Sequence, residues 1–225
     1  MVDLVLDPSK VLTSGVQRDV FFHPFDRYKL IKVLKPQAQL GRRNNFNGIF
    51  DRLFPSTRIR QIRKEYQEYL RIMLQHPEPQ FHLPISHMFG FVTTNLGLGC
   101  LTERIVDEDG ALGKTLSKKV KSGTLTDDDV AALNTMIAEI FDNGIRAGDL
   151  NASNIVFGHR DFGNGPGEME CVLVDGFGDI HAVPVRSWGR SFNRLGLDDG
   201  CRRLAKRTGL RWDKSTRLFS YPDTK

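Results

Sequence analysis

The stretch Gly148-Asp149-Leu150-Asn151-Ala152-Ser153-Asn154-Ile155-Val156 decides how this chain is interpreted. It sets Asp149 five residues before Asn154 and then continues into apolar residues that predict a strand. Further along, Cys171-Val172-Leu173-Val174-Asp175-Gly176-Phe177-Gly178 predicts a second strand that ends in an aspartate and a glycine-rich turn. Each stretch alone also fits an ordinary Asp/Asn-rich turn beside a strand. The two stretches in this order are a stronger signal of a functional site than either stretch alone.

The spacing of these polar residues resembles that of protein kinases. In the kinase catalytic loop an aspartate accepts the proton of the substrate hydroxyl group, and an asparagine five residues later holds a magnesium ion. The resemblance implies that Asp149 is the catalytic base and that Asn154 is a metal ligand. It also implies that Asp175 is the second metal-binding residue, because kinases carry that aspartate at the end of the next strand pair.

Length and composition describe an ordinary globular protein. The 225 residues are enough for one large domain or two small lobes, with 40% hydrophobic and 26% charged residues. No apolar stretch is long enough to cross a bilayer, and the first residues lack the basic region of a signal peptide. Three widely spaced cysteines predict reduced core thiols and a cytoplasmic location: Cys100, Cys171 and Cys201.

The net charge of +5 is modest, and much of it falls in residues 42–64. Such a cluster can attract nucleic acid, anionic lipid or a phosphorylated substrate, although it is more often a solvated face. No nucleic-acid signature accompanies it, so nucleic-acid binding is only a minor alternative. The basic residues of the segment are Arg42, Arg43, Arg52, Arg58, Arg60, Arg63 and Lys64.

Residues 11–22 predict a strand, a small-residue turn and a second strand. Kinases place their phosphate-covering loop here, but this turn has one glycine where kinases have three. Gly15, with Ser14, would let backbone N–H groups approach a phosphate, which makes Gly15 a candidate nucleotide-binding residue. A plain hairpin is the alternative.

The next predicted strand is Tyr28-Lys29-Leu30-Ile31-Lys32-Val33-Leu34, which Pro36 ends. Lys32 is unusual there, because lysines seldom occupy positions where burial is expected. The kinase resemblance implies that Lys32 contacts the α- and β-phosphates of ATP. The alternative is an edge-strand lysine that reaches solvent.

Apolar residues at steps of three and four predict a helix over residues 57–74. A kinase requires a glutamate from this helix to hold the strand lysine. Glu65 borders the apolar face and is the first choice for that role, with Glu68 in reserve. The alternative is that both acids are solvated and pair locally with Arg58, Lys64 or Arg71.

Two further strands are predicted at residues 89–93 and 98–106, around a turn containing Asn95 and Gly97. They complete a small, mainly antiparallel lobe. The kinase resemblance implies that the adenine-binding hinge would lie at residues 103–106, so Glu103 is a candidate nucleotide-binding residue. The acidic run Asp107-Glu108-Asp109-Gly110 predicts the boundary between an N-lobe of residues 1–106 and a C-lobe of residues 107–225.

Thr126 predicts the start of the next helix as an N-cap, followed by three aspartates that favour its first turn, and Gly144 predicts its end. This helix leads to the Asp149 stretch. The tail after Gly178 is short and predicts about two helices, with no Ala-Pro-Glu element. We therefore expect an α+β, two-lobed kinase-like fold with a reduced, mainly helical C-lobe. Residues 161–167 form a glycine-rich loop without an assigned role.

Over most of its length the sequence resembles the YrbL family, bacterial proteins linked to the PhoP regulatory network that are themselves similar to protein kinases. The resemblance implies a kinase fold. The matching elements are Gly15, Leu30-Ile31-Lys32-Val33, Ile62-Arg63-Lys64-Glu65-Tyr66, Asn154-Ile155-Val156, Val174-Asp175-Gly176-Phe177-Gly178 and the family-specific Val183-Pro184-Val185-Arg186-Ser187-Trp188.

We therefore expect a protein that binds ATP and Mg²⁺ and transfers the γ-phosphoryl group to an unknown protein or small molecule. Ala147 and Asn151 depart from the kinase pattern, which commonly has a histidine and a lysine there. A second interpretation is accordingly a pseudokinase that regulates a partner through the basic segment. A third is a small-molecule phosphotransferase, which the Gly-Asp-Leu pattern also fits.

Overall fold

The computed structural model describes residues 3–15, 18–35, 60–78, 81–163, 165–179 and 189–222. The chain forms two compact units, each assembled from separate segments. The boundary predicted from sequence cuts the chain once, after residue 106, whereas both units are discontinuous. The first unit contains Met1–Ile59, His87–Arg104 and Asp161–Gly165, and the second contains Arg60–Ser86, Ile105–Arg160 and Pro166–Lys225.

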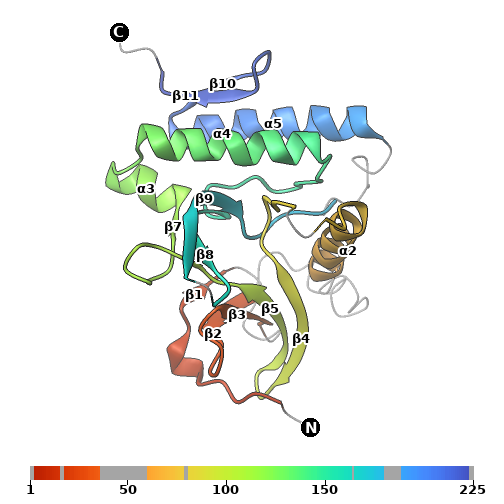
Figure 1. The fold of residues 1–225 in the computed structure, drawn as a ribbon, viewed down its shortest axis with the longest axis vertical. Coiled ribbons are helices and arrows are strands. Elements are labelled where there is room, and N and C mark those ends of the chain that lie inside the picture. The colour runs from red at the N-terminus through yellow and green to blue at the C-terminus, as the bar shows by residue number, and fades with distance from the viewer. Residues whose placement is uncertain are drawn as a thin grey trace, which may run out of the picture. The chain divides into compact units, whose positions relative to one another are not determined.

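The first unit contains a five-stranded antiparallel sheet in the order β1-β2-β3-β5-β4 (Figure 1). The strands predicted from sequence are therefore present, and a short 3₁₀ helix precedes them. Their bounds are η1 Pro8–Lys10, β1 Thr13–Ser14, β2 Arg18–Phe22, β3 Lys29–Leu34, β4 Met88–Thr94 and β5 Gly97–Glu103.

One face of this sheet is buried beneath the N-terminal segment. Ile31 and Val33, two residues apart on β3, are almost fully buried together with Phe21, Leu4 and Leu6. Alternate residues of a strand point to the same face, which explains why these side chains share one core. Leu4 forms an isolated bridge with Thr94, so the residues before η1 cover that core.

The strand predicted over residues 98–106 is in fact two strands in two sheets. β5 ends at Glu103, while β6 (Ile105–Val106) pairs with β8 of the second unit, with Ile105 opposite Arg160. Arg104 separates them, and its N–H donates to the carbonyl oxygen of Tyr28 at 2.9 Å. Strand propensity along residues 98–106 does not show which strand each residue pairs with, so the sequence alone could not locate the change of sheet.

The second unit contains all four α-helices of the described residues. The predicted start of α4 is confirmed: Thr126 and Asp129 form a reciprocal capping box. Its predicted end is also confirmed, because Gly144 follows the C-cap with a φ of +59°. The helices are α2 Arg60–Gln75, α3 Leu116–Ser122, α4 Asp127–Asp142 and α5 Arg190–Thr208.

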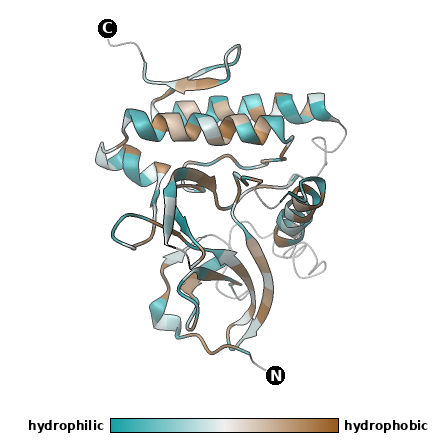
Figure 2. Ribbon diagram, viewed as in Figure 1, coloured by the Kyte–Doolittle hydropathy of each residue, from teal (hydrophilic) through white to brown (hydrophobic). Residues whose placement is uncertain are grey.

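A small sheet in the second unit supports the predicted site. β8 is its central strand and pairs with β6, β7 and β9. α4 packs against β9, and Leu133, Ile137 and Ile140 of α4 are fully buried. Figure 2 shows hydrophobic and hydrophilic residues mixed along this helix. The remaining bounds are β7 Lys114–Thr115, β8 Ile155–Asp161 and β9 Pro166–Leu173.

The described part of the tail has one helix, α5, and a β-hairpin that the sequence did not predict. The hairpin joins β10 (Arg211–Asp213) to β11 (Leu218–Ser220). Trp212 lies with its ring centroid 4.8 Å from that of Phe219 and 6.4 Å from that of Phe141, so aromatic packing fastens the hairpin to α4.

Several predicted features fall outside the described residues. They are the basic residues Arg42, Arg43, Arg52 and Arg58 and the run from Val183 to Trp188.

The side chains of all three cysteines, predicted to be core thiols, are buried. None of the described helices has the length and apolar character needed to cross a membrane.

Candidate active site

The loop from Asp149 to Asn154 folds back on itself. The N–H of Asn151 donates to the carbonyl oxygen of Asp149 at 3.0 Å, and the N–H of Asn154 donates to that of Asn151 at 2.8 Å. The side-chain nitrogen of Asn154 lies 3.3 Å from the Asp149 carbonyl oxygen and 3.5 Å from its Oδ2. The loop therefore turns the Asn154 amide toward Asp149.

Two backbone hydrogen bonds join this loop to the Asp175 turn. The N–H of Asp149 donates to the carbonyl oxygen of Gly176 at 2.9 Å, and the N–H of Val174 donates to that of Asn154 at 2.8 Å. The two stretches singled out in the sequence are thus adjacent within the second unit. Three predicted site residues, Asp149, Asn154 and Asp175, consequently come from neighbouring backbone segments.

Gly176 allows this close approach. Its φ is +79°, and a Cβ built there would lie 2.5 Å from the Asp149 carbonyl oxygen and 3.0 Å from the Asn154 side-chain nitrogen. Only glycine adopts this conformation without cost and leaves room for the neighbouring backbone. The Gly-Phe-Gly sequence therefore serves the contact between the two stretches.

α2 lines the other side of the Asp175 turn. Glu65 is 2% exposed, and its Oε1 accepts from Gln61 Nε2 at 3.0 Å and from the Gly176 N–H at 3.4 Å. Gln61 Nε2 also lies 3.3 Å from Asp175 Oδ1. Sequence reasoning missed Gln61, because nothing in the local pattern of a helix indicates a contact 114 residues away.

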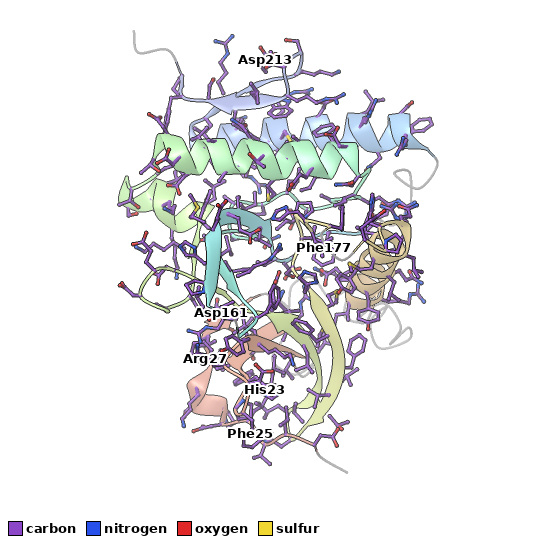
Figure 3. All side chains as sticks on the ribbon, viewed as in Figure 1. His23, Phe25, Arg27, Asp161, Phe177 and Asp213 are labelled. Atoms are coloured by element: carbon purple, nitrogen blue, oxygen red, sulfur yellow. The ribbon has the colours of Figure 1, made fainter. Side chains whose placement is uncertain are left out.

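The end of the turn is held against α2 as well. Lys64 donates through Nζ to the carbonyl oxygen of Asp179. Gly178 has a φ of +91°, and a Cβ there would lie 2.7 Å from the Lys64 carbonyl oxygen. Between the two glycines, Phe177 is 2% exposed and anchors the turn in the unit (Figure 3).

Glu68 fastens α2 to the segment that precedes Asp149. It is 2% exposed, so it is not the solvated acid of the alternative interpretation, although its carboxylate does pair with Arg71 at 2.5 Å. It also accepts from the Arg146 N–H at 2.8 Å and lies 3.3 Å from Arg146 Nη1. The carbonyl oxygen of Arg146 in turn accepts from the Gly178 N–H at 2.6 Å. Glu68 therefore supports both halves of the site.

The donor set fits a magnesium ion better than a transition metal. Asp175 offers a carboxylate, and Asn154, whose amide nitrogen faces Asp149, offers the side-chain oxygen. Mg²⁺ usually takes one or two carboxylates together with substrate phosphates and water. Within the described ranges, no three or more His, Cys, Asp or Glu side chains gather as a metal site. Two protein ligands do not require such a cluster, because phosphates and water supply the remaining ligands of Mg²⁺.

In the first unit, Lys32 occupies a central strand. β3 lies between β2 and β5, and Lys32 pairs with Val20 on one side and Cys100 on the other. Only 7% of Lys32 is exposed, so the edge-strand alternative is wrong. Lys32 belongs to the first unit and Glu65 to the second, and their pairing stays a prediction.

Thr102 is a residue that sequence reasoning missed. It lies two positions beyond Cys100 on β5, so it shares the sheet face of Lys32. Thr102 is 3% exposed, and its hydroxyl oxygen meets no hydrogen-bond partner among the described residues. Buried hydroxyl groups are normally satisfied, which makes Thr102 a candidate ligand-binding residue. Because residues two positions apart on a strand share a face, the predicted strand could have placed Thr102 on the same face as Cys100.

The other two predicted nucleotide-binding residues have partners within the first unit. The Gly15 N–H donates to the Arg18 carbonyl oxygen at 2.8 Å, as in the plain-hairpin alternative. Glu103 is buried and accepts the His87 N–H through Oε1 at 2.9 Å, while its own N–H donates to the His87 carbonyl oxygen at 3.1 Å. Their roles toward a nucleotide remain predictions.

The glycine-rich loop after β8 belongs to the first unit, together with Arg27 and His87. Asp161 lies 3.5 Å from Arg27, and Figure 3 shows these labelled residues beside one another. The ring of Phe162 meets that of His87 edge-on, with centroids 5.6 Å apart. Ion pairing and aromatic packing therefore hold the loop, which the sequence left without a role.

The chain is similar to one protein family and to several solved structures. The sequence profile described as PhoP regulatory network protein YrbL matches residues 4–209. Among solved structures, a crystal structure of Rad53 1–466 in complex with AMP-PNP is similar, with 14% identity, a TM-score of 0.47, and coverage of 95% of this chain and 47% of that one. An apo form of PpkA-294 is also similar, with 16% identity, a TM-score of 0.46, and coverage of 86% and 60%. The chain thus spans about half to three fifths of their length. No curated protein matches it.

Proposed function

Because the chain belongs to the YrbL family of PhoP regulatory network proteins and has a kinase-like α+β fold, we propose that it binds ATP with Mg²⁺ and transfers the γ-phosphoryl group to an acceptor hydroxyl. The observation that carries this proposal is the hydrogen bond from the Asp149 N–H to the Gly176 carbonyl oxygen, at 2.9 Å. This bond holds the backbone of Asp149, the proposed base, against the turn that carries Asp175, a proposed Mg²⁺ ligand.

The second unit supplies the chemistry in this proposal. Asp149 accepts the proton of the acceptor hydroxyl, and its backbone is held by Gly176 on one side and Asn151 on the other. Asn154 and Asp175 would hold Mg²⁺, which when bound neutralises charge on the phosphates. Glu65 and Gln61 hold the turn that carries Asp175.

The first unit supplies nucleotide-binding residues in this proposal. Lys32 would bind the α- and β-phosphates, and its burial strengthens its attraction to an anion because the surroundings screen it little. Thr102 would offer its hydroxyl group on the same sheet face. Gly15 and Glu103 would contribute backbone groups. Since the Gly15 N–H is already used, another N–H of that turn would have to meet a phosphate.

A pseudokinase is the second candidate function. The glycine-poor turn at Gly15, closed by its own hydrogen bond, favours it, because a phosphate-binding loop needs exposed N–H groups. Asn151 also stands where kinases commonly carry a lysine. The acceptor in the first proposal is a protein or a small molecule, and a small-molecule phosphotransferase is one form of that proposal.

A thermal-shift experiment tests nucleotide binding. A ligand at one hundred times its Kd stabilises a protein by about 2.7 kcal/mol, so ATP with Mg²⁺ should raise the melting temperature of the purified chain clearly. Asp175→Asn should abolish the Mg²⁺-dependent part of the shift. Asp109→Asn, at an exposed site, is the matched control and should behave as the wild type. No shift with ATP and Mg²⁺, or an undiminished shift in Asp175→Asn, would contradict the proposal.

A further inference from the structure

Gln61 places one amide group between two carboxylates of the second unit. Its Nε2 lies 3.0 Å from Glu65 Oε1 and 3.3 Å from Asp175 Oδ1. A primary amide nitrogen carries two N–H donors, so it can donate to both oxygens together. Gln61 is half-buried, and its neighbour Glu65 is almost fully buried.

The contact with Asp175 is not a by-product of helix geometry. A glutamine and a glutamate four residues apart on a helix often pair. That explains the contact between Gln61 and Glu65 but not the one with Asp175, which lies 114 residues further along the chain. The contact with Asp175 fixes a side chain in the turn that follows β9.

Asp175 Oδ1 is held from two directions. It accepts the N–H of Gly176 at 2.7 Å and lies 3.3 Å from Gln61 Nε2. Two donors on one oxygen fix the rotation of the carboxylate and therefore the direction of Oδ2. A lysine in place of Gln61 would also donate, but its charge would cancel the negative charge that attracts a cation. A neutral amide orients the carboxylate and leaves its charge intact.

We propose that Gln61 is a positioning residue that sets the orientation of Asp175 for divalent-cation binding. This inference rests on the proposed function, because it takes Asp175 as a cation ligand. Partners that orient a ligand typically change metal affinity by about 10–100-fold when they are removed. Gln61 should therefore affect cation affinity and leave the affinity for the nucleotide alone unchanged.

The test measures Mn²⁺ binding by electron paramagnetic resonance in the full chain with a non-hydrolysable ATP analogue. Gln61→Met keeps the length and helix propensity of the side chain but removes both donors. We expect Mn²⁺ affinity to fall by about 10-fold or more. Gln67→Met, on the exposed face of α2, is the matched control and should bind Mn²⁺ as the wild type does. Analogue binding without a divalent cation reports whether the variant is folded.

A double variant separates positioning from general damage. If Gln61 acts through Asp175, adding Gln61→Met to Asp175→Asn should cause no further loss of Mn²⁺ affinity. The inference would be overturned if Gln61→Met bound Mn²⁺ with wild-type affinity, or if the losses of affinity were additive in the double variant. In either case, a loss of Mn²⁺ affinity in Asp175→Asn alone would still support the cation site. Absence of Mn²⁺ binding in the wild type, or full binding in Asp175→Asn, would overturn the cation site and the inference together.

Discussion

The backbone N–H of Asp149 donates to the carbonyl oxygen of Gly176 at 2.9 Å. This bond joins two stretches that lie far apart in the sequence and that both carry candidate site residues. It depends on the absence of a side chain at Gly176, where a Cβ would fall 2.5 Å from the Asp149 carbonyl oxygen. The geometry of the proposed site is therefore sensitive to a single methyl group.

Gly176→Ala should destabilise the second unit and displace Asp149. A left-handed backbone costs a residue with a Cβ about 1–2 kcal/mol, and the clash adds to that. Gly110→Ala is the matched control, because Gly110 has a similar φ of +74° but open space around its Cβ position. We expect a larger loss of unfolding free energy, measured with urea, in Gly176→Ala than in Gly110→Ala. Equal losses would show that the close approach has no energetic consequence.

Glu68→Ala should destabilise the chain by about 2–3 kcal/mol. In the wild type, Arg71 and Arg146 donate hydrogen bonds to the buried carboxylate of Glu68, and the substitution removes that acceptor. Glu78→Ala, at a 65% exposed carboxylate after α2, is the control and should change stability by less than about 0.5 kcal/mol. Denaturant melts of both variants measure the difference. A Glu68→Ala protein as stable as Glu78→Ala would remove Glu68 from the support of the site.

His82 predicts a pH dependence of stability. Its ring nitrogens lie 2.9 Å from Glu139 and 2.8 Å from Glu170, and these hydrogen bonds raise the pKa of His82 from 6.5 to about 9. A raised pKa means that the charged form is favoured in the folded chain. The stabilisation is therefore complete below pH 6.5 and is lost as the pH rises through about 9.

The comparison of wild type with His82→Gln measures this dependence. The wild type should be the more stable protein at pH 6, and the difference in unfolding free energy should shrink steadily toward pH 9.5. The same substitution at His159, whose ring contacts the carbonyl oxygen of Gly167, is the control. A difference that stays constant with pH would show that His82 is not held as a cation between the two glutamates.

Features that depend on local pattern could be predicted from the sequence. The Thr126 cap, the Gly144 stop and the alternation on β3 follow from rules that act within a few residues. α3 was missed although Thr115 caps it and Gly123 ends it, because the helix is short and has few apolar residues. Propensity alone gives a weak signal over so few positions.

Features that depend on distant contacts could not be predicted. The second contact of Gln61, the pairing of Glu68 with Arg146 and the change of sheet at Arg104 each join segments far apart in the chain. The spacing of Asp149 and Asn154 could be interpreted because one loop contains both residues. Their proximity to Asp175 followed from the kinase resemblance, and the structure supplies the backbone hydrogen bonds that produce it.

The most direct test of the proposed phosphoryl transfer is single-turnover phosphate release from γ-labelled ATP, measured beside ATP affinity. With water as the acceptor in place of the unknown hydroxyl, the wild type should release phosphate. A positioned base contributes about 10²–10⁴-fold, so Asp149→Asn should be slower on that scale with unchanged ATP affinity. Lys32→Met should also be slow and should bind ATP less tightly, while Asp109→Asn should match the wild type. Equal residual rates in the wild type, Asp149→Asn and Lys32→Met, with ATP still bound, would contradict the account and support a pseudokinase.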